Sequence, residues 1–435
     1  MDIKELYKLY LQHPSIKTDT RKLKEGDLFF ALKGPNFNGN HFAIQALNAG
    51  AAYVIADENL SFSDDRIIRI PDVLLTLQQL AKHHREQFNN IPFVAITGSN
   101  GKTTTKELVH QVLSASYKTY TTEGNLNNHI GIPLTILKIK KDAEMAVIEM
   151  GANHQKEIEG YCSYAMPTHG LITNCGKAHL EGFGSEEGVR KGKGELFEFL
   201  KEHNGIAFVN GDDNYIKEMS TGIKNIITYG TLQGFITGRA VSNSSLLEVE
   251  VIKGTDISSI KTQLVGQYNL LNVLAAVAIG KHFNIADEKI KAAIENYTPS
   301  NSRSQLITMG TNKIILDAYN ANPASMKAAI ENFAQMPGTN KILLIGSMME
   351  LGNESKKEHE ALIRLIEKYK WSNVILVGNN FKNIRHSYFY FDDASKAKAW
   401  LNNQQLQNSQ ILIKGSRSME MEKILETNSR LHTTQ

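Results

Sequence analysis

Phe93-Val94-Ala95-Ile96-Thr97 runs directly into Gly98-Ser99-Asn100-Gly101-Lys102-Thr103-Thr104, and this stretch decides the fold. The first five residues are mostly apolar and favour β structure, which predicts a buried strand. The glycines let the backbone turn tightly and direct its N–H groups at phosphate oxygens, while a helix beginning at about Thr103 adds the positive end of its dipole. We predict a phosphate-binding loop for ATP, in which Lys102 reaches the terminal phosphates and the Thr103 hydroxyl coordinates Mg²⁺. The predicted nucleotide contacts are Gly98, Ser99, Asn100, Gly101, Lys102, Thr103 and Thr104.

The loop is shorter than the common phosphate-binding pattern, which has a glycine five residues before the Gly-Lys pair. Here that position is Ile96, and the glycine comes three residues before Gly101, at Gly98. One alternative is a chance Gly-Lys-Thr in an ordinary strand-to-helix turn. Another is a P-loop GTPase or ATPase switch, which would use the longer loop and a guanine-reading Asn-Lys-x-Asp stretch after a strand. The sequence shows no such stretch.

Apolar runs typical of strands recur along the chain on both sides of this loop, and they alternate with stretches of helical spacing such as 108–113. This alternation predicts an α/β architecture with mostly parallel sheet. The predicted strands are 93–97, 145–149, 170–173, 206–209, 314–317, 341–346, 374–378 and 411–414.

The length of 435 residues fits about three domains. Asn89-Asn90-Ile91-Pro92 precedes the strand of the loop, and the polar stretch Thr298-Pro299-Ser300-Asn301-Ser302 is a second break. We therefore expect domains at 1–90, 91–300 and 301–435. Their predicted folds are an α/β N-terminal substrate domain, a central P-loop ATPase-type domain with mostly parallel sheet, and a C-terminal Rossmann-like domain.

Composition and charge argue against several classes of protein. Lys plus Arg number 48 and Asp plus Glu 45, and the resulting net charge of +3 argues against a nucleic-acid-binding surface. The two cysteines, Cys162 and Cys175, are too few for a disulfide framework or a four-cysteine zinc site. The charged N-terminus lacks the apolar core of a signal peptide, and the apolar runs are far shorter than the roughly 20 residues of a membrane helix. We expect a cytoplasmic protein without membrane insertion.

Two segments downstream of the loop carry candidate metal ligands. Glu149 ends the apolar run 145–149, where a carboxylate facing the loop would bind Mg²⁺. The alternative is that Glu149 caps the next turn. His179 lies in a polar, glycine-rich loop after the run 170–173 and is either a ligand or a structural residue. Composition does not separate the two.

Taken together, these stretches resemble the Mur ligase family, which also includes folylpolyglutamate synthetase-like enzymes. The resemblance covers nearly the whole chain, with the motifs in matching order and spacing. The motifs are 97–104, Glu123-Gly124-Asn125-Leu126-Asn127-Asn128-His129-Ile130-Gly131-Ile132-Pro133, 149–152, His179-Leu180-Glu181-Gly182-Phe183-Gly184-Ser185 and Gly266-Gln267-Tyr268-Asn269-Leu270-Leu271-Asn272.

Within this family, the third part of the chain resembles the members that join D-alanyl-D-alanine to UDP-N-acetylmuramoyl-tripeptide. The stretch 26–34 resembles their uridine-nucleotide-binding domain. Members that add the third amino acid normally show an aspartate-tyrosine-alanine-histidine stretch and an Asp-Asn-Pro-Arg selector, and neither occurs here. The matching third-part motifs are Asp317-Ala318-Tyr319-Asn320-Ala321-Asn322-Pro323-Ala324-Ser325-Met326 and Gly346-Ser347-Met348-Met349-Glu350-Leu351-Gly352, with His359 further on.

The resemblance implies an ATP-dependent amide ligase, which we expect to be a monomer. ATP would phosphorylate the C-terminal carboxylate of the UDP-linked tripeptide, and the amine of D-alanyl-D-alanine would attack the acyl phosphate. Because carboxylate and ATP are both anionic, Lys102 and Mg²⁺ would have to neutralise charge before they meet. The strand ends at 317–320, 346–348, 378–380 and 414–417 would take the dipeptide, as expected at the carboxyl edge of a parallel sheet.

Carried over by position, the resemblance assigns ligands to two Mg²⁺ ions. Thr103 and Glu149 would hold the ion beside ATP, and His179 would hold the second. Lys193 aligns with the lysine that the family often carbamylates, which would give a carboxylate-like ligand for the second ion. The alternative is an exposed helix lysine, since Lys191 lies two residues away and two neighbouring glycines weaken the helix.

Further positions match nucleotide and substrate contacts of the family. Asn272 matches the adenine contact, while Arg303 and Asp317 match positions that reach the phosphates and ribose. Tyr319 and Asn320 are candidates for nucleotide and substrate contact. Asparagines and the other polar residues here could instead cap helices or form turns. The candidate contacts to the UDP-linked substrate are Thr20, Arg21, Asn127 and Asn128.

One position departs from the family pattern. An Asp-Gly-His stretch commonly follows the Lys-Gly of the first domain, but here the chain reads Asn38-Gly39-Asn40-His41. The lost charge at Asn38 leaves the details of nucleotide binding there open. Two rival functions remain. A folylpolyglutamate synthetase would need a pterin-sized apolar pocket, and a non-catalytic relative would act as a binding protein.

Overall fold

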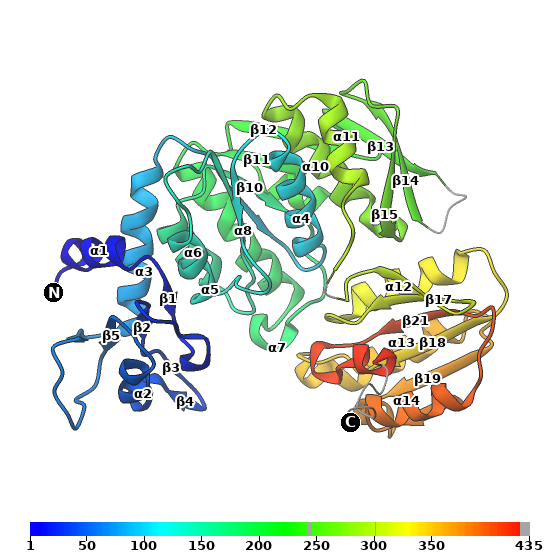
Figure 1. Cartoon of the computed structure of the whole chain (residues 1–435). Helices are drawn as coiled ribbons and strands as arrows, with labels where there is room; N and C mark the ends of the chain where they lie inside the picture. The colour runs from blue at the N-terminus through cyan, green and yellow to red at the C-terminus, as the bar shows by residue number, and fades with distance from the viewer. Residues whose placement is uncertain (242–245, 301, 427–435) are drawn as a thin grey trace, which may run out of the picture.

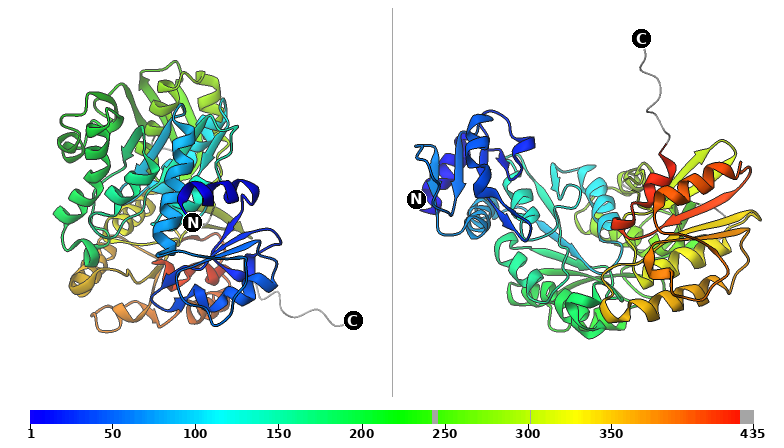
Figure 2. Two further views of the ribbon diagram at one scale, coloured as in Figure 1. Left: turned by 90° about the vertical axis from the view of Figure 1, so that its left-hand side faces the viewer. Right: turned by 90° about the horizontal axis from the view of Figure 1, so that it is seen from below.

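The computed structural model describes residues 1–241, 246–300 and 302–426, and this part of the chain forms three α/β domains on three main sheets. Figures 1 and 2 show the domains along an arc, with the central domain between the first and the third. The prediction of a three-domain α/β protein with mostly parallel sheets is confirmed. Asn301 of the second predicted break, and residues 427–435 of the predicted third domain, lie outside the described residues.

The first domain is built on a parallel sheet of four short strands. Its elements are α1 (Ile3–Gln12), β1 (Ile16–Lys17), β2 (Leu28–Phe30), β3 (Lys33–Gly34), β4 (Phe37–Asn38), α2 (Ala43–Asn48), β5 (Tyr53–Ala56), β6 (Ile67–Arg69) and α3 (Val73–Arg85). The strand order is β1-β2-β5-β6, and β3 pairs with β4 beside it. Asp2 and Asp72 start α1 and α3 because their side chains accept hydrogen bonds from backbone N–H groups of the first turn.

The central domain is built on a nine-stranded sheet. Its elements are β7 (Phe93–Thr97), α4 (Lys102–Ser114), β8 (Thr119–Thr121), α5 (Gly131–Leu137), β9 (Met145–Glu149), α6 (Glu157–Ala165), β10 (His169–Ile172), α7 (Leu180–Phe183), α8 (Glu186–Glu202), β11 (Ile206–Asn210), α9 (Asn214–Met219), β12 (Asn225–Gly230), β13 (Ile236–Val241), β14 (Leu246–Lys253), β15 (Ser259–Val265), α10 (Leu270–His282) and α11 (Asp287–Glu295). The strand order is β15-β14-β13-β12-β11-β10-β7-β9-β8, with β13–β14 and β14–β15 antiparallel. Because β7 pairs in parallel with β9 and β10, the carboxyl ends of these three strands lie at one edge.

The third domain is built on a six-stranded sheet. Its elements are β16 (Gln305–Met309), β17 (Asn312–Asp317), α12 (Pro323–Gln335), β18 (Lys341–Gly346), α13 (Ser355–Ile366), β19 (Asn373–Val377), β20 (Phe389–Phe391), α14 (Ala394–Asn403) and β21 (Gln410–Lys414). The strand order is β16-β17-β21-β18-β19-β20, and β16 joins β17 as an antiparallel hairpin. The strands β17, β21 and β18 run in parallel and end at the same edge.

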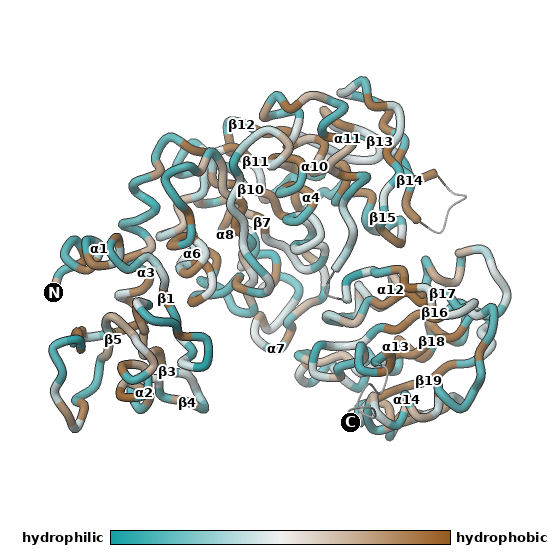
Figure 3. Tube along the Cα trace, viewed as in Figure 1, coloured by the Kyte–Doolittle hydropathy of each residue, from teal (hydrophilic) through white to brown (hydrophobic). Residues whose placement is uncertain are grey.

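The apolar cores follow the sheets, as the brown strands inside each domain show in Figure 3. All five residues of β7 are buried. One apolar cluster continues from the first domain into the central one, because Leu80 and Phe88 pack in the same cluster as Phe93 and Ile132. The first two domains therefore share a core, and a boundary at residue 90 stays a prediction.

All eight apolar runs predicted as strands form strands, with ends that differ by no more than two residues. The helix after the loop begins at Lys102, one residue earlier than predicted. Among the described residues, no helix combines the length and apolar character needed to cross a membrane.

Candidate functional site

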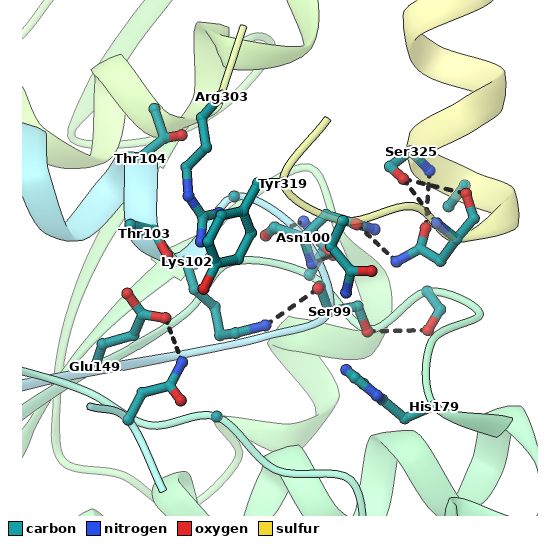
Figure 4. Close-up of a pocket in the computed structure, with 18 of the residues that line it drawn as sticks. Ser99, Asn100, Lys102, Thr103, Thr104, Glu149, His179, Arg303, Tyr319 and Ser325 are labelled. Carbon is teal, nitrogen blue, oxygen red and sulfur yellow. Dashed lines mark hydrogen bonds between the residues drawn. The ribbon is translucent and has the colours of Figure 1, made fainter. Parts of the chain in front are cut away.

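The strand ends of the central and third domains meet at a cleft of about 720 Å³. Figure 4 shows side chains of the phosphate loop, Glu149 and His179 in one view with Arg303, Tyr319 and Ser325. The structure thus brings together residues that are far apart in the sequence. The predicted residues that line the cleft are Ser99, Asn100, Gly101, Lys102, Thr103, Thr104, Asn127, Asn128, Glu149, His179, Asn272, Arg303, Asp317, Tyr319 and Asn320.

Two glycines give the phosphate loop its path. The φ angle is +137° at Gly98 and +79° at Gly101, a region that other residues rarely adopt. A Cβ atom on Gly98 would lie 2.0 Å from Thr173 Oγ1, and one on Gly101 would lie 2.7 Å from Asn272 Oδ1. Thr173 Oγ1 also donates a hydrogen bond of 2.6 Å to the carbonyl oxygen of Asn100. The loop therefore packs directly against the end of β10, and glycine is required at both positions.

Lys102 lies at the start of α4 and folds back over the loop. Its Nζ donates to the carbonyl oxygens of Gly98 at 2.6 Å and Ser99 at 3.2 Å. Burial lowers the pKa of Lys102, and the negative charge of Glu149 opposes this shift. A protonated lysine ammonium group has three N–H donors. Two are used by the loop, which leaves one for a phosphate oxygen.

Glu149 ends β9, and only 1% of its surface is exposed. Its Oε1 accepts a hydrogen bond of 2.7 Å from Asn127 Nδ2, whereas Oε2 is buried without a hydrogen-bond partner among the described residues. A buried carboxylate oxygen in this state is unfavourable unless a cation or donor meets it. Thr103 lines the same cleft with its hydroxyl-bearing side chain. A carboxylate and a hydroxyl are oxygen ligands of the kind that Mg²⁺ prefers, so the two residues fit this ion.

His179 follows β10 in a loop and has a φ angle of +51°. Its Nδ1 lies 2.6 Å from Glu350 Oε2 of the third domain, but without the alignment of a hydrogen bond. The contact with His179 lowers the pKa of Glu350. The described residues hold no group of three or more His, Cys, Asp or Glu side chains placed to bind a metal. Glu149 and His179 thus line one cleft without forming a preassembled metal site.

Lys193 is fully buried in α8, so the alternative of an exposed helix lysine is wrong. Its Nζ donates a hydrogen bond of 2.8 Å to the carbonyl oxygen of Ala152, a residue that lines the cleft. Burial, with the charge of Lys102, lowers the pKa of Lys193 to about 7. The neighbouring glycines do not break α8. A Cβ atom on Gly192 would lie 2.5 Å from Phe183 Cε1, so this glycine lets α8 pack against α7.

The third domain contributes charged side chains to the cleft, and contacts within that domain hold them in place. The guanidinium carbon of Arg303 lies 3.5 Å from the centre of the Tyr319 ring. Asp317 Oδ2 accepts a hydrogen bond of 2.7 Å from Lys414 Nζ, and Asp317 Oδ1 accepts one of 3.2 Å from the N–H of Ser304. Lys414 begins the predicted strand end 414–417, lines the cleft and is 2% exposed. Its pairing with Asp317 was not predicted.

Asn272 and Asn128 each form hydrogen bonds within the central domain. Asn272 Oδ1 accepts a hydrogen bond of 3.0 Å from Thr105 Oγ1, and its Nδ2 donates one of 2.9 Å to Asn269 Oδ1. It therefore ties α4 to α10 at the edge of the cleft. Asn128 Oδ1 accepts a hydrogen bond of 2.9 Å from the N–H of Gly131, which begins α5. Turn formation, the alternative weighed for Asn128, applies, because its Oδ1 also accepts a hydrogen bond of 3.2 Å from the N–H of Ile130.

Two predicted substrate residues lie in the first domain and do not line the cleft. Thr20 and Arg21 form a short turn, where the exposed Arg21 guanidinium pairs with Asp19 at 2.8 Å. The structure also explains the departure at Asn38. Its Nδ2 lies 3.0 Å from both carboxylate oxygens of Glu58, where an aspartate would meet a like charge. Gly98, the first residue of the phosphate loop, also does not line the cleft.

Three family models match the chain, one on each domain. The model of the Mur ligase family catalytic domain matches residues 14–85, that of the Mur ligase middle domain matches 96–280, and that of the Mur ligase glutamate ligase domain matches 302–417. The chain is 36% identical over 428 residues to UDP-N-acetylmuramoyl-tripeptide–D-alanyl-D-alanine ligase of Escherichia coli, covering 94% of this chain and 92% of that protein. It is 34% identical over 426 residues to the ligase of the same name from Bacillus subtilis, with 94% and 92% covered.

Solved structures show the same likeness. MurF from Acinetobacter baumannii superposes with a TM-score of 0.87 at 31% identity, covering 94% of this chain and 92% of that one. MurF ligase from Thermotoga maritima in complex with ADP gives a TM-score of 0.84 at 28% identity, with 95% and 97% covered. Folylpolyglutamate synthase from Mycobacterium tuberculosis, at 13% identity and a TM-score of 0.62, shares the fold alone.

Proposed function

Because this chain belongs to the Mur ligase family, we propose that it is the ATP-dependent ligase that joins D-alanyl-D-alanine to UDP-N-acetylmuramoyl-tripeptide in peptidoglycan precursor synthesis. The observation that carries the proposal is the cleft itself. It sets a phosphate loop and a buried carboxylate opposite the polar strand ends of a second sheet. A ligase needs this arrangement, since a nucleotide and two further reactants must meet in one place.

The reaction has two steps, and the cleft residues have a role in each. First a carboxylate oxygen of the tripeptide attacks the γ-phosphorus of ATP, the bond to the bridging oxygen breaks, and ADP leaves. Lys102 donates to the transferred phosphoryl group and offsets its charge, as in other phosphoryl transfers. Then the amine nitrogen of D-alanyl-D-alanine attacks the acyl carbon and loses a proton, and inorganic phosphate leaves as the amide forms.

We propose that two Mg²⁺ ions bind beside the phosphate loop. Thr103 and Glu149 would hold the ion beside ATP, which supplies positive charge at the phosphates. The free Oε2 of Glu149 supports this assignment. His179 would be a ligand of the second ion. Lys193 would support that ion after carbamylation, in which its neutral amine adds to carbon dioxide and releases a proton. Its lowered pKa favours this reaction because only the unprotonated amine is nucleophilic.

Nucleotide and substrate contacts follow from the position of each residue in the cleft. We assign Asn272, Arg303, Asp317 and Tyr319 to the nucleotide, together with the loop. Asn127, Asn128 and Asn320 are assigned to the peptide substrates, and Thr20 and Arg21 to the UDP end. The dipeptide would bind at the strand ends of the third domain. We further propose a monomer that works in the cytoplasm, since one chain supplies every group named here.

The competing assignment is a folylpolyglutamate synthetase, which would use the same loop and the same phosphoryl chemistry. The polar character of the cleft favours the peptide ligase. Its lining is dominated by asparagine, serine, threonine and charged side chains, whereas a pterin ring calls for a flat apolar pocket.

Phosphate release by the purified protein tests the proposal. With ATP and Mg²⁺ present, UDP-N-acetylmuramoyl-tripeptide and D-alanyl-D-alanine are supplied together and then separately, with the Lys102→Ala variant as the inactive control. We expect steady release only when both substrates are present and wild-type protein is used. Phosphate release that requires folate and glutamate instead would identify a folylpolyglutamate synthetase. Phosphate release without any acceptor substrate would identify a simple ATPase.

A further inference from the structure

A hydrogen bond between two side-chain amides joins the phosphate loop to the third domain. Asn322 Nδ2 donates to Asn100 Oδ1 at 2.8 Å, and both residues line the cleft. We propose that Asn322 is a positioning residue that holds the third domain against the phosphate loop through this bond and thereby strengthens nucleotide binding. The inference rests on the proposed nucleotide site and is independent of which amide the enzyme makes.

The third-domain end of this bond is fixed by the start of α12. Asn322 is the N-cap of this helix, and its Oδ1 accepts a hydrogen bond of 2.9 Å from the N–H of Ser325. The N–H of Asn322 in turn donates to Ser325 Oγ at 3.1 Å, which completes a capping box. Because Oδ1 is used by the cap, the amide cannot rotate without losing it. Its Nδ2 is therefore directed away from the helix and at the loop.

The loop end is fixed by the end of β10. The N–H of Asn100 donates to Asn174 Oδ1 at 3.0 Å, and the Asn100 carbonyl oxygen accepts bonds from Thr173 Oγ1 and Asn174 Nδ2 at 2.6 and 3.1 Å. The backbone of Asn100 is thus held without help from the third domain. The side chain of Asn100 is therefore left to accept the hydrogen bond from Asn322. Losing Asn322 should leave the loop in place but release the third domain from it.

The location of Asn322 explains why nucleotide binding would respond. Of the residues that we assign to the nucleotide, Asp317 ends β17, and Tyr319 lies in the connection from β17 to α12, which Asn322 ends. A bond that holds the end of this connection against the loop also holds these two side chains on the nucleotide side of the cleft. Without it, the third domain must be ordered when the nucleotide binds, which weakens the observed affinity.

Asn322→Ser separates the bond from the helix cap. Serine caps helices about as well as asparagine but is too short to reach Asn100. By calorimetry we expect the Kd of a non-hydrolysable ATP analogue to rise about fivefold, the usual effect of losing one neutral hydrogen bond. The KM for ATP should rise by the same factor, while kcat at saturating ATP stays within about twofold of wild type. If Asn322 had a merely structural role, Asn322→Ser would lower the midpoint of thermal unfolding, and the KM for ATP would not rise separately from a change in kcat.

Two further variants keep the test decisive. Asp393→Ser makes the matched change at the N-cap of α14, where Asp393 accepts from the N–H of Lys396, and should leave the Kd unchanged. Asn100→Ala breaks the bond from the other side without touching the cap, and adding Asn322→Ser to it should cause no further loss. Wild-type affinity in Asn322→Ser, or a double variant whose losses add, would overturn the proposal. Nucleotide binding is measured directly, so a failure of ligation would count against the proposed function alone.

Discussion

At the scale of single residues, Lys193 shows how burial changes the chemistry of a common side chain. Its pKa is lowered to about 7, whereas lysine in an unfolded chain titrates near 10.4. Between these values the native side chain is neutral and the unfolded one is charged, so the unfolded state binds the extra proton. The free energy of unfolding therefore rises with pH across this window, and below it the full cost of burying the charge is present.

We therefore predict that Lys193→Met removes this part of the pH dependence. Denaturant unfolding of wild type and variant in carbonate-free buffer, from about pH 7 to about pH 10, gives the two slopes directly. The wild-type free energy of unfolding should increase more steeply with pH than that of the variant. Parallel slopes would show that Lys193 keeps an ordinary pKa in the folded protein.

Asn38 is a second residue whose identity the structure accounts for. The variant Asn38→Asp places a carboxylate beside Glu58, and we expect it to lower the free energy of unfolding by about 1–2 kcal/mol, because a donated bond is replaced by repulsion. Adding Glu58→Gln restores a donor opposite Asp and should recover most of the loss in thermal unfolding. If Asn38→Asp is as stable as wild type, the amide does not serve this purpose.

The sequence motifs predicted the phosphate-loop side of the cleft, but they did not predict the contacts that depend on tertiary packing. Glu149 ends one buried strand and Lys102 follows the short glycine loop after another, so their meeting at the carboxyl edge of the sheet could be inferred before any coordinates. The burial of Lys193 depends on how α8 packs, and the pairing of Lys414 with Asp317 depends on two strands about a hundred residues apart. Contacts of that kind are set by tertiary structure and leave little local signal.

At the scale of elements, the turn from β7 into α4 tolerates little change at its first glycine. For Gly98→Ala we predict a loss of about 2–4 kcal/mol in the free energy of unfolding, since the new Cβ would collide with Thr173 Oγ1 in addition to the backbone strain. Nucleotide binding should weaken with it. The matched control is Gly310→Ala, where φ is +60° and nothing lies within 4 Å of the added methyl group, so strain alone acts. Equal losses in the two variants would contradict the packing argument.

Element prediction succeeded where strands are buried on both faces and therefore read as continuous apolar runs. The strands β13 to β15 were not predicted. In β14 buried and partly buried residues alternate, as in an antiparallel strand with one face toward the core, so no apolar run marks it. The strands of the first domain are two to four residues long, which is too short for a periodic pattern to appear.

At the scale of the whole molecule, polar contacts join the central and third domains beside the cleft. Lys177 Nζ lies 3.0 Å from Glu358 Oε1 of α13, and His179 meets Glu350 nearby. We predict that Glu358→Gln favours separation of the two domains, because Lys177 loses its charge partner in the third domain and keeps the one in the central domain, Glu186 at 3.7 Å. Small-angle scattering should give a larger radius of gyration for this variant than for wild type.

The control for this prediction lies on the same helix. Glu360→Gln removes the same charge, but Glu360 pairs with Arg364 within α13 and not with the central domain. Its scattering should match that of wild type. An unchanged radius of gyration in Glu358→Gln would mean that other contacts determine how the domains sit. Such contacts, like the core shared by the first two domains, could not be read from the sequence, because they join segments that no local pattern connects.

The central claim is that ATP activates a carboxylate by phosphoryl transfer before the amide forms. It is tested most directly by labelling the C-terminal carboxylate of UDP-N-acetylmuramoyl-tripeptide with oxygen-18 and analysing the phosphate released during ligation by mass spectrometry. Attack of the carboxylate on ATP predicts that each phosphate released carries one oxygen from the tripeptide. Phosphate whose new oxygen comes from water instead would show that ATP is hydrolysed without activating the substrate, and would contradict the account.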